Sequence, residues 1–167
     1  MKALVRALST LAALLPAACG WHAGLGRPAN ASTVGVEAAR RSGTTLERGL
    51  EPLLTDALSI AVADWVELPL VSPQDADLVV RAVLLDYARR GGVRNQDNEL
   101  LESAVFVRAS AELFDRRSGK SLGAPVIAQE WSGYALERGN SEAAARDRAI
   151  RHVANTLILD LFEDKGQ

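Results

Sequence analysis

The sequence predicts a two-layer α+β sandwich, in which a four-stranded, mostly antiparallel sheet is covered by two helices. Of its 167 residues, 48% are hydrophobic and 24% are charged, a balance that suits one folded domain with a buried core. Segments of alternating and of helical hydrophobic spacing follow the order strand, helix, strand, strand, strand, helix. Two apolar helix stripes need one sheet face to cover, which favours two layers.

The first strand and the first helix are expected between residues 32 and 64. Polar and apolar residues alternate from Ser32 to Ala38, as in a short half-buried strand. The sequence Thr44-Thr45-Leu46-Glu47 fits a capping box, but Pro52 would then lie inside the helix and cost about 3 kcal/mol. We therefore expect the helix to begin near Glu51.

Three further strands and a second helix are expected in the rest of the chain. The run from Ala76 to Arg89 is rich in Val and Leu and predicts a buried strand, and Ser103 to Asp115 alternates most clearly. A turn at 115–120 leads to a strand from about Pro125 to Leu136. Asn140 or Ser141 is expected to cap a final amphipathic helix.

The N-terminus has the layout of a secretory signal. Lys2 and Arg6 precede an apolar run that is too short to span a bilayer, and small residues follow it. The stretch Leu15-Pro16-Ala17-Ala18-Cys19-Gly20 resembles a lipobox, although Pro16 stands where an aliphatic residue is usual. We expect cleavage after residue 18, acylation of Cys19, a tether over 19–31 and a single domain over 32–167. An ordinary cleaved signal that leaves Cys19 free is the alternative.

Several classes of function lack their signature. Net charge is -2, which argues against a nucleic-acid partner. No metal-ligand, phosphate-loop, nucleophile-elbow or dinucleotide motif occurs, and His22 and His152 have no catalytic partner in sequence. Asp75 and Asp77 fit a solvated turn at a strand entry. We therefore expect neither an enzyme nor a bound metal or cofactor.

Two basic groups and two aromatic residues are the remaining candidates for binding. Guanidinium groups at loop tips could bind phosphate or carboxylate, while solvated turns are the plainer interpretation. Trp131 and Tyr134 fit sheet packing, or else a partner contact. The candidate contact residues are Arg89, Arg90 and Arg94 in the expected loop after the second strand, and Arg116, Arg117 and Lys120 at the next hairpin.

The ordered motifs resemble the lipopolysaccharide-assembly lipoprotein family, LptE. Each motif is weak alone, and the resemblance rests on their order and spacing along nearly the whole mature chain. They are Cys19-Gly20-Trp21-His22, Gly49-Leu50-Glu51 with Leu54-Thr55-Asp56-Ala57-Leu58, Ala76-Asp77-Leu78-Val79-Val80, Asp115 with Ser118-Gly119-Lys120, and the final helix.

This resemblance implies a four-stranded sheet covered by two helices, anchored in the outer membrane through Cys19. It further implies that the module partners and plugs the LptD β-barrel, which delivers lipopolysaccharide to the outer leaflet. Contacts of the two basic groups with lipopolysaccharide phosphates or the barrel wall are our own hypothesis. The alternatives are another periplasmic α/β lipoprotein, such as a cell-wall synthase activator, and a lipid-binding protein that should contain a sizeable apolar cavity.

Overall fold

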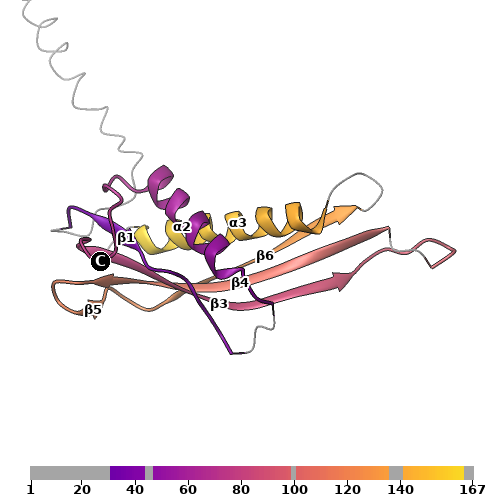
Figure 1. The fold of residues 1–167 in the computed structure, drawn as a ribbon, viewed down its shortest axis with the longest axis horizontal. Coiled ribbons are helices and arrows are strands. Elements are labelled where there is room, and N and C mark those ends of the chain that lie inside the picture. Colours follow the sequence, from indigo (N-terminus) through magenta and orange to yellow (C-terminus); the bar gives the residue numbers. More distant parts are fainter. Residues whose placement is uncertain (1–30, 44–46, 99–100, 136–140, 164–167) are drawn as a thin grey trace, which may run out of the picture.

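Two helices lie side by side on one face of a mixed sheet, and the other face of that sheet is left open (Figure 1). The structure is a computed structural model that describes residues 31–43, 47–98, 101–135 and 141–163. Helix α2 spans Glu51–Trp65 and helix α3 spans Glu142–Phe162. The two-layer α+β sandwich expected from the sequence is therefore confirmed.

The sheet is built around one long antiparallel pair of strands. Strands β1 and β2 pair in parallel with β3, which pairs antiparallel with β4, and both β5 and β6 pair antiparallel with β4. The sheet thus contains the four expected strands and two additional strands, β2 and β5, of two residues each. The strands are β1 (Val34–Val36), β2 (Arg40–Arg41), β3 (Leu78–Gly91), β4 (Glu102–Asp115), β5 (Lys120–Ser121) and β6 (Val126–Ala135).

The alternation seen in the sequence assigns the two faces of β4. Successive side chains of a strand point to opposite faces, so one set meets the helices and the other remains on the open face. The set that meets the helices is buried, and it consists of Val105, Val107, Ala109, Ala111 and Leu113. These residues form one core with the buried faces of both helices.

Both helices begin where the sequence indicates. Helix α2 starts at Glu51 with Pro52 in its first turn, where a missing N–H costs nothing. The residues of the alternative capping box at 44–46 lie outside the described residues. Ser141 is the N-cap of α3, and its hydroxyl accepts a hydrogen bond from the Ala144 N–H at 3.2 Å.

Two boundaries differ from the expectation. The first strand is shorter, because only Val34–Val36 pair with β3 before the chain leaves the edge and returns as β2. Strand β3 begins and ends two residues later than expected and runs to Gly91, since after a register shift between Leu84 and Asp86 its pairing with β4 continues through Arg90, which lies opposite Ala104. Arg89 and Arg90 are therefore strand residues and not loop residues.

No helix within the described ranges is long and apolar enough to cross a membrane.

Candidate functional site

Hydrogen bonds join Ser32 and Thr33, near the beginning of the described chain, to Asp77 just before β3. Cys19 and residues 20–30 lie outside the described residues. Asp77 accepts hydrogen bonds from the Ser32 hydroxyl at 2.6 Å and from the Ser32 N–H at 2.9 Å. These bonds, with one from Thr33 and the nearby Arg117 guanidinium, hold the pKa of Asp77 below its usual value. Asp77, which was expected in a solvated turn, thus binds the beginning of the described chain to the sheet.

The second basic group surrounds the β4–β5 turn. Arg116 donates a hydrogen bond to the Pro73 carbonyl at 2.7 Å, and Arg117 lies 3.8 Å from Asp77. Hydrogen bonds from Ser118 and from the Arg117 N–H lower the pKa of Asp115. Lys120 is exposed in β5. Arg116 therefore has a structural role, whereas Arg117 and Lys120 extend into solvent.

The first basic group lies at the far end of β3, and Arg89 belongs to the fold. Arg89 forms ion pairs with Glu142 at 2.6 Å and with Glu47 at 3.1 Å, so it ties the start of α3 and residue 47 to β3. A hydrogen bond with Tyr87 and, to a smaller extent, the charges of Glu142 and Glu47 raise the pKa of Arg89 above its ordinary value. Burial raises the pKa of Tyr87. This network keeps Arg89 on the helix side of the sheet.

Arg90 and Arg94 are directed elsewhere. Arg90 is on the open face, where its guanidinium carbon lies 5.0 Å from the Trp131 ring centroid. Arg94 donates a hydrogen bond to the Asn98 carbonyl at 2.7 Å within the loop beyond β3. The three arginines that are close in sequence therefore point to three different surroundings.

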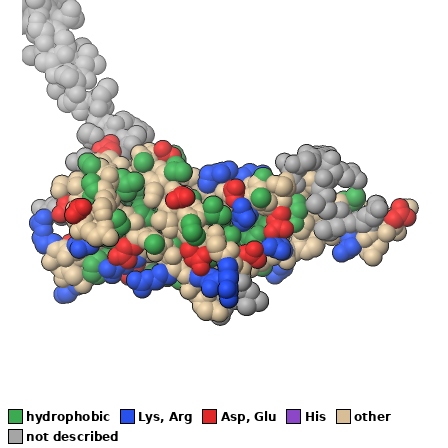
Figure 2. All heavy atoms as spheres, viewed as in Figure 1, with side chains coloured by type: hydrophobic (Ala, Val, Ile, Leu, Met, Phe, Trp, Pro, Cys, Tyr) green, Lys and Arg blue, Asp and Glu red, His purple; other side chains and the backbone are tan. Residues whose placement is uncertain are grey.

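The two basic groups stand at opposite ends of the sheet. Arg90 lies opposite Ala104, whereas Arg116 and Arg117 follow Asp115 at the other end of β4. Ala104 and Asp115 are eleven residue steps apart along β4, which is about 35 Å at the usual rise per residue. Basic and acidic side chains are interleaved along the body (Figure 2). The six candidate residues thus do not converge on one ligand.

An aromatic cluster occupies the open face near the first basic group. The rings of Phe106 and Trp131 have centroids 4.5 Å apart, and Trp131 is 43% exposed. A hollow of about 430 Å³ lies beside Trp131. Its floor is short of side chains, because Gly91, Gly92 and Gly133 contribute to its lining. This cluster combines exposed aromatic surface with the Arg90 guanidinium, a composition typical of interaction surfaces.

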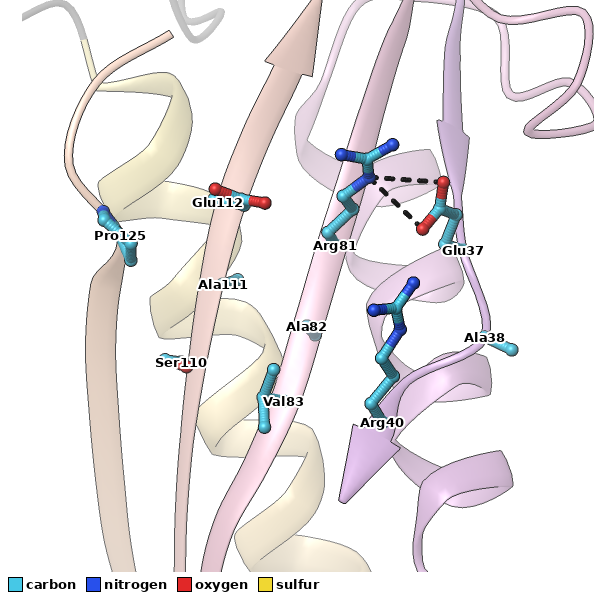
Figure 3. A pocket seen from close by; sticks show the side chains of 10 residues that line it. All are labelled: Glu37, Ala38, Arg40, Arg81, Ala82, Val83, Ser110, Ala111, Glu112 and Pro125. Carbon is cyan, nitrogen blue, oxygen red and sulfur yellow. Dashed lines mark hydrogen bonds and ion pairs between the residues drawn. The ribbon is translucent and has the colours of Figure 1, made fainter. Parts of the chain in front are cut away.

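A second hollow lies nearer the middle of the open face. It has a volume of about 180 Å³ and contains the Arg81–Glu37 ion pair at 3.2 Å (Figure 3). The Arg81 guanidinium also lies 3.6 Å from the Phe114 ring centroid, and Arg40 points toward the same pair. Because Glu37 and Glu112 also line it, the charges in this hollow are balanced. We regard it as a feature that holds β1 to β3.

The sequence interpretation did not single out Phe106 and Arg81 as candidate site residues. The alternation did place Phe106 opposite the buried set, but it did not reveal that Trp131 of β6 lies directly across from it. Tyr134 packs against the core, as expected of a sheet residue.

His152 of α3 is exposed and lies 3.4 Å from Glu130. Within the described ranges, no group of three or more His, Cys, Asp or Glu side chains is placed to hold a metal ion.

This chain is similar to several solved structures. The PelC dodecamer from Paraburkholderia phytofirmans matches with a TM-score of 0.50 and 15% identity, over 80% of this chain and 93% of that chain. A minor lipoprotein from Acinetobacter baumannii matches with a TM-score of 0.44 and 16% identity, over 78% and 90%. The rare lipoprotein B from Shewanella oneidensis matches with a TM-score of 0.42 and 13% identity, over 75% and 92%.

These solved structures include bacterial lipoproteins, and at such identities the likeness concerns the fold alone. No protein-family model matches the sequence. No curated protein matches it at a significant level.

Proposed function

We propose that this chain is an outer-membrane lipoprotein, acylated at Cys19, that partners and plugs an LptD-type β-barrel during lipopolysaccharide transport to the outer leaflet. One observation carries the proposal. An acylatable cysteine is followed by two strands, a helix, four strands and a helix, of which β2 and β5 have two residues each, and both helices cover one face of the sheet. That is the arrangement which the resemblance to the LptE family implies.

The surface of the domain also suits the interior of a barrel. A lumen wall is polar, so a plug needs a water-compatible exterior with scattered charges. The open face provides the charged side chains Arg81, Arg108 and Glu112 in addition to the apolar side chains Phe106 and Ile127. Strands of 14 residues reach about 45 Å, which exceeds the roughly 30 Å hydrocarbon thickness that a plugged barrel crosses.

The anchor keeps the domain near the membrane. The chain between Cys19 and the Ser32–Asp77 hydrogen bonds has about a dozen residues, which span at most about 40 Å when fully extended. A partner in the same membrane lies within this reach. A cell-wall synthase activator would benefit from a longer tether, so this alternative fits less well.

The alternative of a lipid-binding protein has little support. The space between the sheet and the helices is filled by buried aliphatic side chains such as Leu58, Leu84 and Leu157. A carrier would need an enclosed apolar cavity in this position.

We also propose that the domain is not catalytic. The shifted pKa values of Glu51, Asp77 and Asp115 have structural causes, namely hydrogen bonds at a helix start, at the chain lead and in a turn. Lipopolysaccharide contact by the two basic groups stays a hypothesis that charge removal can test.

Site-specific photo-cross-linking tests the proposed partnership. A photoreactive amino acid at Arg108, on the open face, should cross-link the full-length protein to a large outer-membrane β-barrel in its bacterial host. The same amino acid at Val153, which is buried, is the matched control and should give background. Absence of any barrel adduct from Arg108 and from further exposed positions on both faces would contradict the plug.

A further inference from the structure

Within the described residues, strand β6 lies at the edge of the sheet. Strand β6 pairs with β4 through all ten of its residues, and within the described ranges no strand pairs with its other side. Its exposed side chains include Ile127, at 54%, and Trp131, at 43%. A long edge strand of this kind is a template for pairing with another strand.

Two hydrogen bonds identify which residues of β6 face outward. The Leu122 N–H donates to the Leu113 carbonyl, so the odd-numbered residues of β4 direct their backbone groups toward the β5–β6 side. In register, these odd residues of β4 lie opposite the even residues of β6. The Gly133 carbonyl, on an odd residue of β6, instead accepts from Arg148 at 2.9 Å. The odd residues of β6 therefore direct their N–H and C=O groups to the free edge.

We propose that this edge pairs with the same edge of a second copy of the chain, antiparallel and with the two-fold axis at Gln129. Ile127 then lies opposite Trp131 of the second copy, and Gln129 lies opposite Gln129. Each such pair exchanges two backbone hydrogen bonds. The outward N–H groups of Ile127, Gln129 and Trp131 are all satisfied, and the two sheets become continuous.

The side chains favour this register over its neighbours. It pairs an exposed aliphatic residue with an exposed indole on the open face, and such cross-strand pairs stabilise sheets. A shift of the axis to Glu130 would place two glutamates directly opposite each other, which is unfavourable. A shift to Trp131 would require the Gly133 carbonyl, which Arg148 already occupies. In the Gln129 register, Gly133 meets Pro125, which has no N–H to donate.

The inference is independent of the proposed barrel partnership, because it concerns contacts between copies of this chain. Disulfide cross-linking of the full-length protein in its bacterial host tests it. Gln129→Cys places two cysteines opposite each other at a Cα separation of about 5.5 Å, which a disulfide can bridge. Ile127→Cys is the matched control on the same edge, because its two copies would be more than about 10 Å apart in this register. The wild-type chain, whose one cysteine is Cys19, gives the background.

We expect a covalent dimer from Gln129→Cys under mild oxidation and background from Ile127→Cys. Adding Ile127→Pro to Gln129→Cys should abolish the dimer, since it removes an outward N–H and leaves the bonds to β4 intact. Adding Ile127→Val should retain it, and equal monomer levels show that both variants fold. Equal cross-linking of both cysteines, or none from Gln129→Cys, would overturn the inference. A Gln129→Cys adduct with a different protein would assign the edge to another partner and would likewise overturn it.

Discussion

Ser32 and Asp77 join the beginning of the described chain to the beginning of β3, with 2.6 Å between the Ser32 hydroxyl oxygen and the Asp77 carboxylate. They are 45 residues apart in sequence. Because Asp77 also accepts from the Ser32 N–H and contacts Arg117, one carboxylate connects the lead, β3 and the β4–β5 turn. The Asp77 contacts therefore fix Ser32, near the beginning of the described chain, to the sheet.

Asp77→Asn should change the pH dependence of stability. The pKa of Asp77 is lowered in the folded protein, so its stabilising effect is present above the unfolded value near 3.8 and is lost as pH falls through the folded value. The variant should have a lower melting temperature at neutral pH, and its deficit should shrink below about pH 4. Thermal melts from pH 7 to pH 3 measure this. A deficit that stays constant over the range would mean that the carboxylate charge does not contribute.

Gly92→Ala should destabilise the far end of the β3–β4 pair. A Cβ at Gly92 would clash with the Glu102 carbonyl oxygen, and because this is a backbone atom the strand itself has to move. We expect a loss of about 1–3 kcal/mol in the free energy of unfolding. Gly91→Ala is the matched control, since nothing lies within 4 Å of a Cβ there. Chemical denaturation compares the two, and equal losses would contradict the close approach.

Leu157→Ala should test the packing of α3 on the sheet. Leu157 is fully buried, and removing its side chain should cost about 2–5 kcal/mol. Leu159→Ala on the same helix is the control, because Leu159 is 37% exposed and its loss should cost far less. Similar costs at both positions in urea unfolding would argue against this orientation of the helix.

The two basic groups should act separately on lipopolysaccharide if they bind it. Arg90→Gln with Arg94→Gln, and Arg117→Gln with Lys120→Gln, should each weaken binding about tenfold, or about 1.4 kcal/mol. Because the groups are about 35 Å apart, the two effects should add in free energy. Arg48→Gln with Arg151→Gln removes the same charge elsewhere and serves as the control. Binding of purified lipopolysaccharide that is unchanged in both variants would refute the contact hypothesis.

The sequence was sufficient for the order of elements and the faces of β4. Alternation from Val105 to Leu113 reports burial directly, and Pro52 and Ser141 locate the helix starts because proline and serine have strong positional preferences. The end of β3 was not predictable, since Arg89 and Arg90 resemble loop residues until their pairing with β4 is known. Their different surroundings depend on Glu142 and Trp131, which are distant in sequence. The Phe106–Trp131 contact required the register between β4 and β6.

Affinity purification from solubilised outer membranes of the native host tests the central proposal most directly. The full-length protein and the Cys19→Ser variant are compared, with partners and the N-terminal peptide identified by mass spectrometry. We expect an acylated Cys19 and stoichiometric recovery of an LptD-type barrel with the wild-type chain, and a loss of both with the variant. Recovery of a cell-wall synthase in place of a barrel, or an unmodified Cys19, would contradict the proposal.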